Sequence, residues 1–445
     1  MKKRKYTLKD YRIFLGTQEI AGVMLRLHNA FDDLGITNSY YCVPEYVYGT
    51  AEGGEYKNEE LRHYDRHTEH VKKMYWANHR IRFRLWQLVQ MFDVLWIFIK
   101  ALFRYNAFIY IFGRGLFFRN FYLSHIQFLE YWILRLFHKR VVIWCCGDDT
   151  RPPYCGSFDG DSKALKTVTK QKAKIVRMQE KYAVMIDFPA SSHFHKRPYI
   201  NYTSIGVPID QNEIAGKKDK NKEKVVIFHA PSDQKWKGTQ TIRKVIAHIK
   251  SLGFPVEYVE VTGVSHETVI EMIAESDIVV DQMFSDTPMA GFAAEAAANG
   301  IPVVVAGYYA DYYKTQFCRP IPPTCFCRPD QLERMLISLI QDQQERIKVG
   351  ALEKKFVMEN WMSHDVAKRM LSLIDGTYPK EWLYDPKQNA YIWGAGNRKR
   401  WVAEKVVDLA DHYGMKALCL PKQSILYQKY LKLYKKQKDL RKSRK

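Results

Sequence analysis

The stretch that decides the fold is VVIFHAPSDQKWKGT, residues 225–239, together with the alternation that continues from it to Val305. Apolar strands are predicted at 225–228, 256–261 and 278–281, with helices at 239–253 and 266–275 between them. Strands that alternate with helices of about 10 to 15 residues indicate a parallel, doubly wound α/β sheet. Ligands of such sheets bind outside the carboxyl ends of the strands. The segments around Lys237 and 286–295 are expected at that edge.

Four motifs in this half resemble the donor-binding half of retaining GT-B glycosyltransferases, most closely over residues 225–375. They are His229-Ala230-Pro231-Ser232, Lys237-Gly238-Thr239, residues 277–282 (DIVVDQ) and residues 295–303 (EAAANGIPV). The resemblance implies two Rossmann-like doubly wound domains that face a cleft. It also implies a nucleotide-diphosphate sugar as donor substrate, with neither a metal nor another cofactor.

The resemblance gives Lys237 and Gly238 a role at the donor diphosphate. A diphosphate leaving group gains negative charge as the glycosidic bond breaks, so a fixed cation before a helix start suits it. The family commonly has an arginine five residues before this lysine, where this chain has Ser232. The alternative for Lys237 is an ordinary exposed lysine at the start of a helix.

Glu295 matches the family's glutamate that accepts hydrogen bonds from the donor ribose. An acidic residue eight positions earlier usually contacts the sugar, and here that position is Thr287, with Asp286 beside it. Asp286 is expected to substitute if the loop shifts by one residue. The alternative for Glu295 is a charge on the solvent face of an alanine-rich helix.

The first half of the chain is predicted to be another α/β domain. Its first strand, residues 11–16, turns at Gly22 into a helix, and the glycine serves either close approach of a ligand or tight helix–strand packing. After a strand at 141–144, the loop at 147–153 resembles the family's Gly-x-Asp-x-Arg segment. Asp149 and Arg151 are the candidate catalytic residues there, and Cys146 stands where the family often has histidine.

The length of 445 residues predicts two domains. We expect an acceptor domain at 1–215, a linker at 216–223, a donor domain at 224–378, and an appended strand–helix–strand unit with a basic tail at 379–445. The strands of that unit are expected at 390–392 and 415–420. Residues 44–73, polar with two adjacent glycines, are predicted to form a long exposed loop and a candidate lid.

Sixty-nine lysines and arginines against 48 acidic residues give a net charge of +21, which favours an anionic partner. Nucleic acid is not expected, because no motif supports it. Eight cysteines form neither a disulfide framework nor a zinc spacing. Neither a signal peptide nor a spanning helix is expected, since Lys100 interrupts the most apolar run. A cytoplasmic protein, peripheral on the inner face of the membrane, fits this pattern.

Residues 78–139 alternate aromatic with basic side chains. Such a segment either fills the domain core with its arginines extended outward or lies in a membrane interface. The tail from Gln423 becomes almost purely basic, which indicates either a disordered segment after a short helix or an anchor for anionic lipid.

Two further motifs compete with this interpretation. Asp159-Gly160-Asp161 has the form of a metal-binding Asp-x-Asp, although Asp-Gly is foremost a turn dipeptide. Gly394-Ala395-Gly396 resembles the opening of a dinucleotide fingerprint but has Lys399 in place of the third glycine.

From the resemblance to GT-B enzymes we expect a glycosyltransferase that acts on a hydroxyl acceptor such as a lipid-linked or cell-envelope glycan. The alternative is a non-catalytic GT-B scaffold that binds a glycan or a partner protein, since Ser232, Thr287 and Cys146 replace family residues.

Overall fold

The computed structural model describes residues 8–43, 59–156, 158–216, 223–316 and 320–442. Residue contacts divide the chain into two units. Unit 1 comprises residues 1–146, 178–186 and 363–379, and unit 2 comprises residues 147–177, 187–362 and 380–445. The predicted domain boundaries remain predictions, because most of the linker at 216–223 lies outside the described residues.

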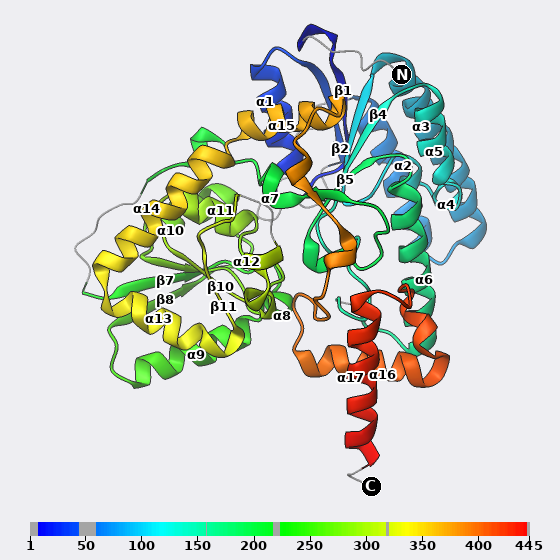
Figure 1. The fold of residues 1–445 in the computed structure, drawn as a ribbon. Helices are drawn as coiled ribbons and strands as arrows, with labels where there is room; N and C mark the ends of the chain where they lie inside the picture. The colour runs from blue at the N-terminus through cyan, green and yellow to red at the C-terminus, as the bar shows by residue number, and fades with distance from the viewer. Residues whose placement is uncertain (1–7, 44–58, 157, 217–222, 317–319, 443–445) are drawn as a thin grey trace. The chain divides into compact units, whose positions relative to one another are not determined.

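Unit 1 contains a parallel sheet in the order β5-β4-β3-β1-β2. Its strands are β1 (Arg12–Gln18), β2 (Thr37–Val43), β3 (Ala107–Ile111), β4 (Arg140–Trp144) and β5 (Val184–Asp187). Its helices are α1 (Val23–Asp33), α2 (Glu59–Trp76), α3 (Arg80–Arg104), α4 (Phe121–Ser124), α5 (Phe128–Leu136) and α15 (Ser363–Asp375). Helices α1 and α15 cover one face of the sheet, and α3 and α5 lie on the other (Figure 1). Every residue of β3 is therefore buried, as its unbroken apolar sequence requires.

Unit 2 contains a second parallel sheet, in the order β11-β10-β9-β7-β8. Its strands are β7 (Val225–His229), β8 (Val256–Glu260), β9 (Ile278–Val280), β10 (Val303–Ala306) and β11 (Cys325–Cys327). A short strand β12 (Leu383–Tyr384) pairs antiparallel with β6 (Tyr199–Asn201). The predicted α/β class with doubly wound parallel sheets is confirmed.

Helices on both faces of this second sheet supply its core (Figure 1). Alternate strand residues such as Ile278 and Val280 pack against α9 and α13, while α11 packs against α14 on the other face. The helices around this sheet are α8 (Gln234–Lys237), α9 (Thr239–Ser251), α10 (His266–Ala274), α11 (Gly291–Ala298), α12 (Tyr313–Gln316), α13 (Leu332–Gln341) and α14 (Gln343–Asn360). The observed ends of β7, α9, β8 and α10 agree with the predicted ones to within two residues.

A separate core in unit 2 joins the middle of the chain to its last helices. Tyr154 and Leu165 pack with Val406 and Tyr430 in one buried cluster. The helices of this core are α6 (Ser162–Gln179), α16 (Lys399–Tyr413) and α17 (Ile425–Lys442), and unit 2 also contains the short helix α7 (Tyr202–Ile205). The segment after α16 thus has a packing role with α6.

Four predictions of secondary structure are wrong. Residues 59–73 are helical in α2, which packs against α3, and the rest of the predicted loop, 44–58, lies outside the described residues. Residues 390–392 form no strand, and 415–418 form a 3-10 turn that packs on α16. Of the two alternatives for the tail, the disordered segment is wrong: residues 425–442 are an ordered helix, because Leu426 and Tyr430 are buried in the core shared with α6, and the lipid anchor stays a prediction.

Helix α3 carries apolar side chains on its exposed side as well as on its buried side. Its buried face includes Gln87 and Gln90, whose side-chain oxygens accept hydrogen bonds from the Asn120 amide. The exposed apolar side chains are Ile81, Leu85, Leu88, Val89, Phe92, Trp96, Ile99 and Phe103, with exposed fractions from 40% to 78%. The buried face also carries apolar residues, among them Val94, Ile97 and Phe98, so α3 is apolar on two sides. Its outward side is an exposed apolar surface of the kind that marks an interaction site.

The expectation that no helix is apolar enough to span a membrane needs correction. Among the described residues, α3 alone is long and apolar enough by length and composition, with 39% of its most apolar window buried in the protein. Lys100 does not interrupt the helix, which extends over 25 residues. The buried hydrogen bonds of Gln87 and Gln90 nevertheless tie α3 to unit 1, so length and composition are weak evidence for a span.

We predict that buried His193 makes unit 2 sensitive to acid. Burial lowers the pKa of His193 to about 3, and its Nε2 lies 3.1 Å from the Tyr430 hydroxyl. In the unfolded chain the His193 ring takes up a proton near pH 6.5. The stability that the neutral, buried ring gives to the folded state is therefore complete above pH 6.5 and is lost as the pH falls toward 3. Between pH 6.5 and 5, wild type should lose about 2 kcal/mol more than His193→Gln, at about 1.4 kcal/mol per pH unit.

Urea unfolding of both proteins at pH 7.5 and pH 5.0 measures this difference. The comparison of wild type with His193→Gln controls for the other titrating groups, because both proteins contain them. Equal losses of unfolding free energy in the two proteins would contradict the assignment.

Candidate functional site

The carboxyl ends of β7 and β9 form the topological switch point of the sheet in unit 2. From β7 the chain goes to β8 on one side and returns to β9 on the other, so the loops after β7 and β9 diverge there. Lys237, after β7, donates to Asp281 Oδ1 across this point over 2.7 Å. The second oxygen of Asp281, Oδ2, is buried without a hydrogen-bond partner among the described residues. Lys237 therefore stands at the predicted edge, already paired with a carboxylate.

Gly238 lets the loop of Lys237 approach the loop after β9. Its φ of 70° lies in the left-handed region, and a Cβ there would lie 2.6 Å from the Met283 Cβ. The Met283 N–H also donates to the Lys237 carbonyl over 2.9 Å. The predicted residue Gly238 is thus required by backbone conformation and by packing.

Two helices at the switch point begin without a side-chain cap. No side chain accepts a hydrogen bond at the N-terminus of α9, which follows Gly238, or of α11, which follows Ala290. In contrast, Ser265 caps α10 and Asp342 caps α14. Uncapped helix N-termini present backbone N–H groups and the positive end of the helix dipole, which together favour an anion.

Glu295 lies on α11 and is almost fully buried. Its Oε1 is 3.0 Å from the Nε2 of His266, the first residue of α10, and Glu213 Oε1 is 3.9 Å from the same nitrogen. The three ligand atoms lie within 4.8 Å of one another, which is close enough for a cation. At 3.0 Å, however, a hydrogen bond already accounts for the His266–Glu295 contact. The sequence did not single out His266, although its place at a helix start after β8 was a usable signal.

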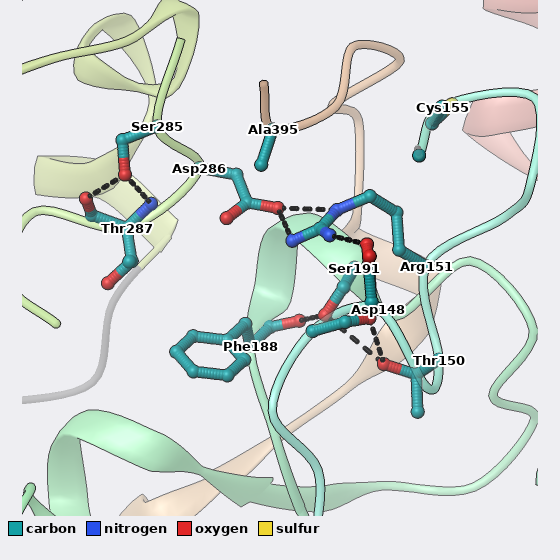
Figure 2. A network of polar contacts seen from close by, with 12 residues as sticks. Asp148, Thr150, Arg151, Cys155, Phe188, Ser191, Ser285, Asp286, Thr287 and Ala395 are labelled. Atoms are coloured by element: carbon teal, nitrogen blue, oxygen red, sulfur yellow. Dashed lines mark hydrogen bonds and ion pairs between the residues drawn. The ribbon is translucent and has the colours of Figure 1, made fainter. Parts of the chain in front are cut away.

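Arg151 and Asp286 form a buried ion pair in unit 2 (Figure 2). Arg151 donates through Nε and Nη2 to Asp286 Oδ2, over 2.9 and 2.5 Å, and through Nη1 to Asp148. The side chains of Arg151 and Asp286 are 8% and 5% exposed. Burial alone would lower the pKa of Arg151, but Asp286 and Asp148 raise it, so the guanidinium stays charged. The two sequence-predicted residues are brought into direct contact.

Hydrogen bonds from neighbouring residues hold the loop that carries Arg151 in place. Asp187 accepts hydrogen bonds from Thr150 and Ser191 through one oxygen and lies 3.0 Å from the His195 ring through the other (Figure 2 shows Thr150 and Ser191). Lys172 donates to the Asp148 and Arg151 carbonyls, and burial lowers the pKa of its ammonium. Sequence reasoning missed this support, whose one local signal is an aspartate at the end of a strand.

The remaining predicted residues of these loops have different settings. Asp149 is half-buried beside Arg151, and Ser232 is exposed before α8. The Thr287 hydroxyl contacts the Tyr202 hydroxyl and also lies 3.4 Å from the Met289 carbonyl. Thr287 therefore has a structural partner where the resembled family has an acidic residue.

The two glycines of the fingerprint-like motif are required by close backbone packing. A Cβ on Gly394 would lie 1.7 Å from the Cys155 carbonyl oxygen, and one on Gly396 would lie 2.9 Å from the Trp236 ring. The Gly396 N–H donates to the Phe284 carbonyl over 3.1 Å. The segment of residues 393–397 thus joins the segments around Cys155, Trp236 and Phe284.

The corresponding switch point of unit 1, between β1 and β3, is occupied by the chain itself. The Glu19 carboxylate accepts hydrogen bonds from the backbone N–H groups of Ile20, Met24 and Leu25 at the start of α1. Burial raises the pKa of Glu19. Gly22 adopts a φ of 72° at this helix start. Its predicted contact with a donor stays a prediction.

The competing Asp-x-Asp motif has a structural explanation. Asp159 and Asp161 are exposed, and Asp161 Oδ1 accepts from the Ala164 N–H over 2.7 Å at the start of α6. An aspartate that caps a helix needs no metal to explain its position.

Comparison with known proteins gives only weak likenesses. Neither a protein-family model nor a curated protein matches the sequence. Among solved structures, sucrose-phosphate synthase from Thermosynechococcus elongatus is 12% identical, with 82% of this chain and 99% of that chain covered and a TM-score of 0.48. Anabaena HepE in complex with UDP and glucose is 13% identical, with 81% and 98% covered and a TM-score of 0.47.

A glycosyltransferase from Rickettsia africae is 9% identical, with 82% of this chain and 98% of that chain covered and a TM-score of 0.46. At such identities and TM-scores below 0.5, these likenesses assign no function.

We predict strong coupling between Arg151 and Asp286. Arg151→Met leaves the buried Asp286 charge unpaired, whereas Asp286→Leu leaves Arg151 with the partly exposed Asp148 as its carboxylate partner. Arg151→Met should lower the free energy of unfolding by about 3–5 kcal/mol, and Asp286→Leu should lower it by less. The double variant Arg151→Met/Asp286→Leu should lose less than the sum of the single variants, because it removes both charges. Urea unfolding measures all three.

The exposed pair Arg328–Asp330 is the matched control. Its alanine variants should each change the unfolding free energy by less than about 1 kcal/mol. Additive losses for Arg151 and Asp286 would show that the two side chains are not coupled.

Proposed function

We propose that the chain is a nucleotide-sugar glycosyltransferase of the GT-B type. One observation carries the proposal. At the switch point of a parallel sheet, Lys237 directly precedes α9 and bonds Asp281, and neither α9 nor α11, which follows the loop after β9, has a side-chain cap at its N-terminus. This combination suits a diphosphate, because backbone N–H groups, helix dipoles and an ammonium group all favour negative charge there.

In this proposal the donor diphosphate lies at the starts of α9 and α11 and takes one donor of Lys237. The Lys237 ammonium has three donors, and one of them already bonds Asp281. Glu295 accepts hydrogen bonds from the ribose hydroxyls, and His266 orients its carboxylate from 3.0 Å. As the bond from the sugar to the diphosphate breaks, the charge that develops on the leaving group is stabilised by groups already in place.

We further propose that transfer goes to a hydroxyl acceptor without a metal ion and with retention at the anomeric carbon. The loop of Asp149 and Arg151 would face the acceptor side of the donor. Arg151 fixes the position of Asp286, so a hydrogen bond donated by a sugar hydroxyl would be accepted by a carboxylate that is already oriented.

A second candidate function is a non-catalytic GT-B scaffold that binds a glycan or a partner protein. The observation that favours it is that polar groups of the site are already engaged. Lys237 pairs with Asp281, Arg151 with Asp286, and Thr287 contacts Tyr202. A scaffold would bind the nucleotide without releasing it from the sugar.

We predict that one nucleoside diphosphate raises the melting temperature of the protein. In a panel of UDP, GDP, ADP, dTDP and CMP with their sugars, Lys237→Ala and Glu295→Ala should abolish the shift, because each removes a proposed donor contact. Lys235→Ala is the control, since this neighbouring exposed lysine lies over Trp236 and Trp401. A panel without any shift would reject the donor site.

Slow release of free nucleotide from the bound donor separates the two candidate functions. The enzyme should transfer the sugar to water at a low rate, whereas a scaffold should leave the donor intact.

We propose in addition that the protein is cytoplasmic and peripheral on the inner face of the membrane, with a lipid-linked or cell-envelope glycan as acceptor. The outward apolar face of α3 supports this. The face continues onto α5, where Phe137 packs edge-on against Phe103 with ring centres 6.0 Å apart. Exposed cations on the same helices, among them Arg84, Lys100 and Arg135, suit anionic headgroups.

We predict that the protein floats with vesicles of anionic lipid at low salt. Trp96→Ser/Phe103→Ser should reduce the bound fraction about tenfold, because two aromatic side chains no longer enter the interface. Ile347→Ser/Leu352→Ser is the matched control, since both residues are 50% exposed on α14. Equal loss in the two double variants, or no flotation of wild type, would contradict the proposal.

A further inference from the structure

A pocket on unit 2 has a cationic lining. It is an open cavity of about 510 Å³, and its five charged lining residues are all basic: Lys166, Lys170, Arg177, Lys196 and Lys416. A cavity of this size accommodates a small organic molecule. None of the residues named for the donor site lines it, so it is a different site.

The cations come from three separate parts of the chain. Lys166, Lys170 and Arg177 follow one another at intervals of four and seven residues along α6, which places them on one face of that helix. Lys416 lies in the 3-10 turn after α16, and Lys196 lies in the segment after β5. The positive charges thus converge on the cavity from different walls.

One of these cations is fixed by the fold. The Arg177 guanidinium donates to the Cys419 carbonyl through Nη2 and to the Phe194 carbonyl through Nε, over 3.4 Å for the latter. It therefore ties two walls of the pocket together. Lys166 lies over the Tyr413 ring, 4.2 Å from its centre, so its ammonium is also held at the rim.

This arrangement has an electrostatic cost in the free protein. Like charges four residues apart destabilise a helix, and the other lysines add to the repulsion. Among the residues that the structure describes, no acidic side chain belongs to the lining of this pocket. A polyanion would relieve the repulsion and gain charge-assisted hydrogen bonds from several lysines.

We propose that this pocket binds a ligand with clustered phosphate groups. The shared chemistry is that of a polyphosphorylated small molecule or of the phosphorylated headgroup of a lipid. Several ammonium groups around an open cavity suit phosphate oxygens on more than one group, whereas a single carboxylate would leave most of the cations unpaired.

Tripolyphosphate is the probe, titrated calorimetrically into Lys237→Ala protein. This background removes the proposed phosphate contact of the donor site, so failure of the donor proposal and failure of the pocket proposal give different results. Saturable binding with one equivalent is expected. Lys170→Glu/Lys416→Glu should weaken it by at least about tenfold, because two attractive charges become repulsive.

Lys244→Glu/Lys250→Glu is the matched control. Both lysines are exposed on α9, a helix that contributes no residue to the pocket lining, and the variant makes the same change in net charge. Its affinity should stay within about threefold of the background protein, since distant exposed charges are screened by salt. Equal weakening in the two double variants would overturn the proposal, because binding would then reflect the overall charge of +21. Absence of saturable binding would overturn it as well.

Vesicles identify the source of the phosphate. The protein used is Trp96→Ser/Phe103→Ser, in which membrane binding through the α3 face is reduced. It is mixed with phosphatidate vesicles or with phosphatidylserine vesicles. If the protein prefers phosphatidate vesicles to phosphatidylserine vesicles, and Lys170→Glu/Lys416→Glu removes that preference, the pocket is assigned to a lipid headgroup. Tripolyphosphate binding without that preference assigns it to a soluble ligand.

Discussion

The Arg151–Asp286 ion pair is the interaction on which the polar centre of unit 2 depends. It joins a loop that follows β4 to a loop that follows β9, 135 residues apart in the sequence. Removal of either partner would leave a charge in a site from which water is almost excluded. The neighbouring groups are arranged around this constraint: Asp148 contacts Arg151 from the other side, and Lys172 holds the carbonyls of the same loop.

The switch points of the two parallel sheets differ in how the helices that begin there are capped. In unit 1, Glu19 occupies the helix start with a carboxylate from the chain, so the backbone N–H groups there are satisfied internally. In unit 2, the helices at the equivalent edge begin without such a cap, and Lys237 directly precedes one of them, α9. Since both folds offer the same geometry, this difference in capping is what makes unit 2 the better candidate for an external anion.

The sequence was sufficient where the signal is local. The alternation from β7 to α10 follows from apolar runs and caps such as Ser265, and the edge position of Lys237 follows from the strand before it. The pairing of Arg151 with Asp286 could not be predicted, because no periodicity relates residues so far apart. Gly394 and Gly396 looked like a ligand motif, since the spacing of glycines does not reveal which backbone approaches them.

The α3 helix illustrates another limit of sequence patterns. Its periodicity defines two faces, but both contain apolar residues, and the pattern does not tell which one the domain covers. The structure buries the face that contains Gln87 and Gln90, since their side chains find partners there. Likewise α17 looked like a solvated basic tail, because its few buried residues, Leu426 and Tyr430, stand among many lysines.

The core shared by α6 and α17 makes the folding of unit 2 depend on the order of synthesis. The Cys155 thiol lies 3.0 Å from the Tyr430 hydroxyl, and the two residues are separated by 275 positions in the chain. At roughly 5–20 residues per second, a ribosome needs roughly 15–55 s to make that interval. During this time the apolar side of α6 has no α17 to cover it. A nascent chain must therefore keep this surface from other exposed apolar segments until its last helix has emerged.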